Sequence, residues 1–216
     1  WVPRKPEPLG VEMKTAADAL SSMMIRLEIC EGKERHKHQE WHDEHGHTTA
    51  TTLRLCKPWF GSGRVVFGDS WFVSVKTARE FLRNGLEFCG DVKTNHKLFC
   101  HEALKLATGK DDGNTALYTS KIEVGGEEVE LIGLGQRRGE AVHCFISTCG
   151  TTLEGKPITY SDMIVDAFDA DGNEETLGVS DAKMNHGKRR CPRLLNDITL
   201  AQPATDRHNR YRQFIL

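Results

Sequence analysis

The sequence predicts an α/β protein in which helices pack on a β-sheet. Residues 63–94 read as strand, helix and strand, because an apolar run stops at Gly68 and a helix with a Ser74 cap precedes a second extended run. A candidate hairpin at 10–30 precedes this unit, and three strand-like segments with glycine turns follow it at 116–149. Together these patterns favour an α/β core with a β-rich addition.

The overall composition excludes few functions. The 216 residues are 38% hydrophobic and 28% charged, with a net charge of −2, so any contact with DNA has to rest on local patches. No apolar run approaches the roughly 20 residues that cross a bilayer, and no membrane partner is expected. The seven cysteines form no Cys-x-x-Cys pair, which favours reduced thiols in an intracellular protein. The chain starts at Trp1 and ends in mid-pattern, which indicates a fragment.

The first expected element is a β-hairpin. Strands at 10–19 and 23–30 flank a tight turn at Ser21 and Ser22. Asp18 stands where the first of these strands ends.

A histidine-rich stretch follows the hairpin. Five histidines fall within twelve residues, at positions 36, 38, 42, 45 and 47. Their spacing could ligate a transition metal, but no cysteine accompanies them and their neighbours are charged or polar. A mobile, solvated loop without a structural metal is therefore favoured. A helix that packs Leu53 and Trp59 is expected over 48–59.

The central unit contains the first candidate site residue. Residues 64–67 are an apolar run of buried-strand type, and Asp69 stands where that strand should end. Open α/β sheets place their chemistry at the carboxyl ends of strands. A helix from Ser74 to the residues before Gly85 and a strand at 86–92 complete the unit. The structural alternative is that Asp69 only caps a helix or faces solvent.

The second half of the chain is predicted to be mainly β before a last helix. Strands are expected at 116–124, 127–134 and 141–149, and a helix with Asp206 in its first turn is expected at 206–216. One strong basic cluster lies between them, and its members either contact phosphate groups or occupy a solvated loop. Its members include Lys183, Lys188, Arg189, Arg190 and Arg193.

Three blocks of the sequence resemble the piggyBac transposase family in its transposon-derived branch. Residues 69–74, Asp-Ser-Trp-Phe-Val-Ser, are similar to that family's second catalytic block, Asp-Asn-Phe/Trp-Tyr/Phe-Thr-Ser. Residues 5–33 resemble the first block, from Lys-Pro to Glu-Ile-x-x-Gly-Lys, and its Asp falls on Asp18. Residues 192–206 resemble the approach to the third catalytic Asp, which falls on Asp206.

The resemblance implies an RNase H-like mixed sheet with helices, interrupted by a mainly β insertion before the last helix. Residues 1–99 would form the first part of the core, 100–190 the insertion, and 191–216 the return to the core with the third Asp. Asp18 and Asp69 would lie on neighbouring strands of one mixed sheet.

The chemistry implied is cut-and-paste DNA transposition by a two-metal-ion transposase. Asp18, Asp69 and Asp206 would be both catalytic and metal-binding, holding two Mg²⁺ (or Mn²⁺) ions, which prefer oxygen ligands. Clustered carboxylates repel one another, so raised pKa values are expected without metal. The implied partner is double-stranded DNA, as transposon ends and a TTAA-type target. A homodimer of the full-length protein and a nuclear location are also implied.

Several departures from the family pattern keep other functions open. Ser70 replaces the usual Asn, Asn209 replaces an Asp, and residues 134–139 lack a clean Trp-x-Asp-x-Arg/Lys motif. These departures allow a domesticated, catalytically inactive scaffold that binds DNA or protein. A phosphoryl-acceptor module using Asp69 and a metal-binding interaction protein using the histidines are further alternatives. Convergence of the three aspartates would favour the transposase.

Overall fold

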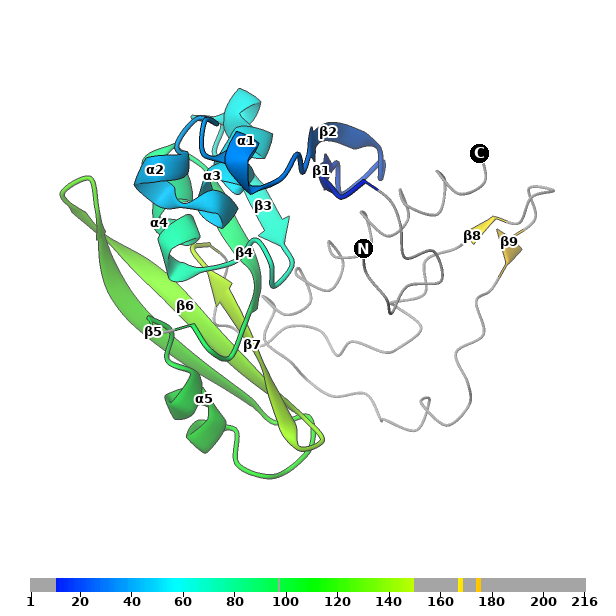
Figure 1. The fold of residues 1–216 in the computed structure, drawn as a ribbon. Coiled ribbons are helices and arrows are strands. Elements are labelled where there is room, and N and C mark those ends of the chain that lie inside the picture. Colours follow the sequence, from blue (N-terminus) through cyan, green and yellow to red (C-terminus); the bar gives the residue numbers. More distant parts are fainter. Residues whose placement is uncertain (1–10, 97, 150–166, 169–173, 176–216) are drawn as a thin grey trace.

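The main body of the protein is a five-stranded mixed sheet with helices packed against it (Figure 1). The computed structural model describes residues 11–96, 98–149, 167–168 and 174–175. The large sheet has the order β3-β4-β7-β6-β5, in which β3 and β4 are parallel and the other neighbours are antiparallel. Its strands are β3 (Val65–Gly68), β4 (Glu87–Val92), β5 (Thr115–Val124), β6 (Glu127–Arg138) and β7 (Ala141–Ser147). The predicted α/β class with a mixed sheet is confirmed.

The β-α-β unit predicted at 63–94 is present. Helix α4 (Val75–Arg83) begins at Ser74, whose Oγ accepts a hydrogen bond from the Thr77 amide at 3.0 Å. It ends before Gly85, whose φ of 67° suits a residue without a side chain. Because parallel strands need a crossover connection, α4 brings β4 back beside β3.

A hairpin of β1 (Met13–Ala17) and β2 (Met24–Ile29) confirms the first predicted element, but it forms a sheet of its own. The expectation that the strands of Asp18 and Asp69 are neighbours in one sheet is wrong. The backbone of β1 is paired with β2, and the hairpin joins the body through side chains instead. One link is the ion pair between Glu28 of β2 and Arg54 of α3, with Nη2 2.7 Å from Oε1.

Strands β5 to β7 belong to the same sheet as β3 and β4, although they were expected within an insertion at 100–190. Strand β7 pairs with both β4 and β6, and Ile146 of β7 is buried in the same apolar cluster as Phe88 of β4. The short helix α5 (His101–Ala107) packs near β6 and buries Leu104. Only β8 (Ala167–Phe168) and β9 (Glu174–Glu175) are described in the remainder of that region.

The histidine-rich stretch is helical rather than a solvated loop. It forms α1 (Lys33–His36), α2 (His42–His45) and the start of α3 (His47–Cys56), which a 3₁₀ turn at Lys57–Trp59 extends. The His36 side chain is only 6% exposed, and its ring centroid lies 4.2 Å from that of His47.

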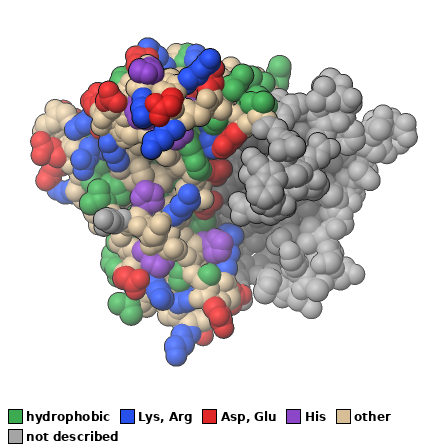
Figure 2. All heavy atoms as spheres, in the orientation of Figure 1, with side chains coloured by type: hydrophobic (Ala, Val, Ile, Leu, Met, Phe, Trp, Pro, Cys, Tyr) green, Lys and Arg blue, Asp and Glu red, His purple; other side chains and the backbone are tan. Residues whose placement is uncertain are grey.

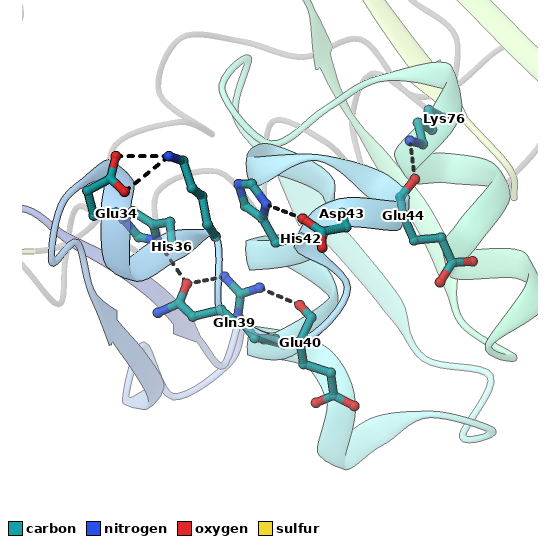
Figure 3. A network of polar contacts seen from close by, with 10 residues as sticks. Glu34, His36, Gln39, Glu40, His42, Asp43, Glu44 and Lys76 are labelled. Atoms are coloured by element: carbon teal, nitrogen blue, oxygen red, sulfur yellow. Dashed lines mark hydrogen bonds and ion pairs between the residues drawn. The ribbon is translucent and has the colours of Figure 1, made fainter.

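Polar residues of this stretch form a network around one arginine, which explains why the loop prediction failed. Figure 3 shows the Gln39 side chain beside His36, to which it is joined by a hydrogen bond. Gln39 Oε1 lies 2.8 Å from His36 Nδ1 and accepts from Arg54 Nη2 at 2.9 Å, while Arg54 Nη1 donates to the Glu40 carbonyl at 2.7 Å.

Within the described residues, no helix is both long and apolar enough to cross a bilayer.

Candidate active site

Asp69 lies directly after β3, at the carboxyl end of a parallel strand. Its Oδ1 accepts a hydrogen bond from the Trp71 amide at 2.7 Å, and its carbonyl accepts from the amides of Phe72 and Val73 at 3.0 and 3.2 Å. The residue is exposed. The tight turn thus fixes the carboxylate through one oxygen and leaves the side chain facing solvent, which suits a ligand for an incoming cation.

Two glycines bring β3 and β4 close together just before Asp69. Gly68 pairs with Gly90, which has φ of +153°. A Cβ on Gly90 would overlap the carbonyl oxygen of Gly68, and a Cβ on Gly68 would lie 2.8 Å from Cγ2 of Val73. No side chain fits at either position, so the backbone that leads into Asp69 is packed from both strands.

The hairpin reaches this turn through Lys14. Lys14 Nζ lies 3.6 Å from the centroid of the Trp71 ring and 2.7 Å from Oε1 of Glu12. The Trp71 ring also lies edge-on to Phe72, with centroids 4.8 Å apart. This cation–π contact places the hairpin beside the residues that follow Asp69.

Asp18 closes the hairpin turn with its own side chain. Oδ2 of Asp18 accepts hydrogen bonds from the Ser21 amide at 2.7 Å and the Ser21 hydroxyl at 2.8 Å. The backbone adds two bonds, from Asp18 N to the Met23 carbonyl and from Ser22 N to the Asp18 carbonyl, both at 2.9 Å. Asp18 therefore has a clear structural role in the turn.

The pKa of Asp18 contradicts the expectation of a raised value. The hydrogen bonds from the Ser21 amide and hydroxyl hold the pKa of this carboxyl below its usual range, with a smaller effect from Arg64. Hydrogen bonds that stabilise the charged form thus outweigh the desolvation that would raise the pKa of this carboxyl.

The other predicted site residues lie outside the described residues. They are Asp206 and the basic residues Lys183, Lys188, Arg189, Arg190 and Arg193. Within the described part of the chain, no group of three or more His, Cys, Asp or Glu side chains is gathered closely enough to hold a metal ion. On the face drawn in Figure 2, basic and acidic side chains of that part alternate.

Lys14, Gly68 and Gly90 shape the site, but no packing role was predicted for them, and Gly68 was noted only as the end of an apolar run. Glycines at strand positions signal a close approach of two backbones, and this signal was available at Gly68 and Gly90. The contact between Lys14 and Trp71 joins two elements that are far apart in the sequence, so no local pattern indicates it.

Two comparisons relate the chain to known proteins. The family described as Transposase IS4 matches residues 1–213. The chain is also similar to the cryo-EM structure of a piggyBac transposase synaptic complex with hairpin DNA, with a TM-score of 0.65 and 16% sequence identity. That similarity covers 99% of this chain and 36% of the other chain, and at this identity it concerns the fold. No curated protein matches the sequence.

Proposed function

Because the chain belongs to the Transposase IS4 family, we propose that it is the catalytic domain of a piggyBac-type transposase, which cuts and joins DNA with divalent metal ions. The observation that carries this proposal is the position of Asp69. It is an exposed carboxylate, fixed by the Trp71 amide, at the carboxyl end of a parallel strand in a sheet of the matching fold.

In this proposal, Asp18, Asp69 and Asp206 together hold two Mg²⁺ or Mn²⁺ ions. Carboxylate oxygens are the hard ligands that both ions accept, and the donor set therefore fits. When bound, the ions would help activate the attacking oxygen and stabilise the leaving oxygen of an in-line displacement at phosphorus.

The chain's own contribution is to hold these carboxylates in position. The Trp71 amide orients Asp69, and the close packing of Gly68 on Gly90 keeps the end of β3 rigid. Ser21 orients Asp18 and favours its ionised form, because its hydrogen bonds lower the pKa of that carboxyl. An ionised carboxylate at neutral pH is the form that binds a cation.

The proposed partner is double-stranded DNA, with transposon ends and a TTAA-type target as substrates. Its phosphates would contact the basic cluster formed by Lys183, Lys188, Arg189, Arg190 and Arg193. Residues 191–216 would return to the core and bring Asp206 to the site. A homodimer of the full-length protein and a nuclear location complete the proposal.

Titration calorimetry with Mn²⁺ tests the metal site. We expect Asp69→Asn to weaken Mn²⁺ binding at least about tenfold, or about 1.4 kcal/mol, because the amide keeps an oxygen for the Trp71 amide but loses the charge. The matched control is Asp43→Asn, since the Asp43 side chain is 95% exposed and lies on α2. Equal binding by wild type and Asp69→Asn would contradict the proposal.

A catalytically inactive scaffold is the second candidate. It is favoured by the engagement of Asp18 in its own turn and by Ser70 and Asn209, which stand where the family pattern has Asn and Asp. Wild-type protein that binds transposon-end DNA but takes up no Mn²⁺ would support this candidate over the enzyme.

A further inference from the structure

Two cysteines meet where the ends of β4 and β7 pack together. Sγ of Cys89, in β4, lies 3.5 Å from Sγ of Cys149, which follows β7. Cys89 is 1% exposed, whereas Cys149 is half-buried. The Ser147 hydroxyl lies 2.8 Å from Cys89 Sγ and donates to the Cys149 carbonyl at 2.5 Å. Both thiols are therefore held in place by neighbours that do not belong to the proposed metal site.

We propose that Cys89 and Cys149 form a reversible disulfide when the protein meets a small disulfide oxidant such as glutathione disulfide. The sulfur atoms already lie side by side, so little backbone movement is needed to join them. This inference does not rest on the proposed function.

The reaction proceeds by two thiol–disulfide exchanges. The more accessible Cys149, as its thiolate, attacks one sulfur of glutathione disulfide, which gives a mixed disulfide and releases one glutathione thiolate. Cys89 then attacks Cys149 Sγ, and its proton passes to the departing glutathione thiolate, which leaves as the second glutathione. The two cysteines are oxidised and one glutathione disulfide is reduced to two glutathione molecules.

Burial assigns the order of these steps. The hydrogen bond to Cys149 and burial both raise the pKa of the Cys89 thiol, so Cys89 is a poor first nucleophile. Because Cys89 is buried, glutathione disulfide cannot reach its sulfur, whereas Cys149 Sγ lies next to it. Cys89 is thus the resolving thiol, and Cys149 is the thiol that meets the oxidant.

The bond would link the strands next to Asp69. Cys89 pairs with Phe67 of β3, two residues before Asp69, and with Ser147 of β7. A disulfide to Cys149 would tie β4 covalently to the residue that follows β7. Oxidation would therefore stiffen the part of the sheet from which the turn of Asp69 departs.

Other described cysteines provide internal controls. Cys56 and Cys144 are 5% and 3% exposed, and burial raises the pKa of the first to about 12 and of the second to about 11. Cys30 is half-buried and Cys100 is exposed. Accessibility alone would make Cys100 react first, whereas proximity favours the pair Cys89 and Cys149.

Disulfide mapping of the folded 216-residue chain by mass spectrometry tests the proposal. After treatment with glutathione disulfide, we expect a Cys89–Cys149 linked peptide roughly tenfold more abundant than any other cross-link. Dithiothreitol should remove it, and Cys100→Ser should leave it unchanged. Cys149→Ser should abolish the linked peptide without adding glutathione to Cys89, and circular dichroism confirms that this variant is folded.

Three outcomes would overturn the proposal. One is a stable glutathione adduct on Cys149 with no cross-link. Another is a dominant linkage through Cys191 or Cys100. The third is a Cys89–Cys149 link that forms only in denaturant. The mapping is read on wild-type protein and needs neither metal nor DNA, so its failure is distinguishable from failure of the transposase proposal.

Discussion

Individual residues around the end of β3 show how local chemistry sets the site. Asp69 is oriented by one backbone amide, and Asp18 is oriented by Ser21, whose hydrogen bonds also lower its pKa. Gly68 and Gly90 have no side chain, which allows the backbones of β3 and β4 to pack closely there. Each of these roles depends on an interaction that a single substitution removes, so each can be tested separately.

Gly90→Ala tests the packing beneath Asp69. The added methyl group would overlap the Gly68 carbonyl and lie 2.8 Å from Cγ2 of Val73, so we expect a loss of about 3 kcal/mol in unfolding free energy. The control is Gly126→Ala, because Gly126 also has a positive φ but has open space around it, and about 1 kcal/mol is expected there. Urea unfolding of both variants measures the difference, and equal losses would contradict the packing argument.

His47 predicts a pH dependence of stability. Burial, and then the nearby His36, lower the pKa of His47 below its usual value. The unfolded chain therefore takes up a proton at His47 before the folded chain does. The stabilisation is fully present above the unfolded pKa of about 6.5 and is lost as pH falls from there through the lower folded value.

His47→Phe isolates this effect, because it keeps a ring beside Trp71 and removes the titration. We expect its unfolding free energy to fall less than that of the wild type between neutral and mildly acidic pH. Urea unfolding of both proteins is measured at each pH and also at pH 8. At pH 8 His47 is uncharged in the folded and the unfolded chain, so the difference in unfolding free energy between the two proteins there comes from packing alone. Parallel profiles would show that His47 does not contribute.

At the scale of elements, helices and strands marked by local sequence signals were predicted correctly, whereas those that depend on contacts with distant residues were missed. The Ser74 cap and Gly85 bound α4 correctly, and glycine turns separated β5, β6 and β7. The short helices at 33–45 were missed because their polar residues are ordered by Arg54, which follows later in the chain. Apolar periodicity contains no information about such a hydrogen-bond network.

Arg54→Lys tests the link between the hairpin and the body. The guanidinium contacts both oxygens of Glu28 and also Gln39, and a lysine amine cannot reproduce this fork. With both side chains mostly buried, we expect a loss of about 2–3 kcal/mol in unfolding free energy. The matched control is Lys57→Met, whose exposed pair with Glu40 should contribute less than about 1 kcal/mol. Similar losses in chemical denaturation would refute a special role for Arg54.

At the scale of the whole molecule, the sheet order was the least predictable feature. The α/β class and the three later strands followed from local patterns, and the mixed sheet was implied by the family resemblance. The insertion of β7 between β4 and β6 depends on contacts across about 60 residues. The separate hairpin sheet was likewise not predictable, because the pattern of a strand does not identify its partner. Of the proposed triad, Asp69 was found from its strand end, whereas Asp18 and Asp206 depended on family resemblance.

The central claim is that Asp18, Asp69 and Asp206 share one metal site, and iron-mediated backbone cleavage tests it most directly. Fe²⁺ takes the place of Mg²⁺, and ascorbate with hydrogen peroxide then generates hydroxyl radicals that cut the chain close to the bound metal. We predict cuts near positions 18, 69 and 206 in the wild type, and loss of all three in Asp69→Asn. Cuts confined to residues 36–47, or cuts near 69 without those near 18 and 206, would contradict the shared site.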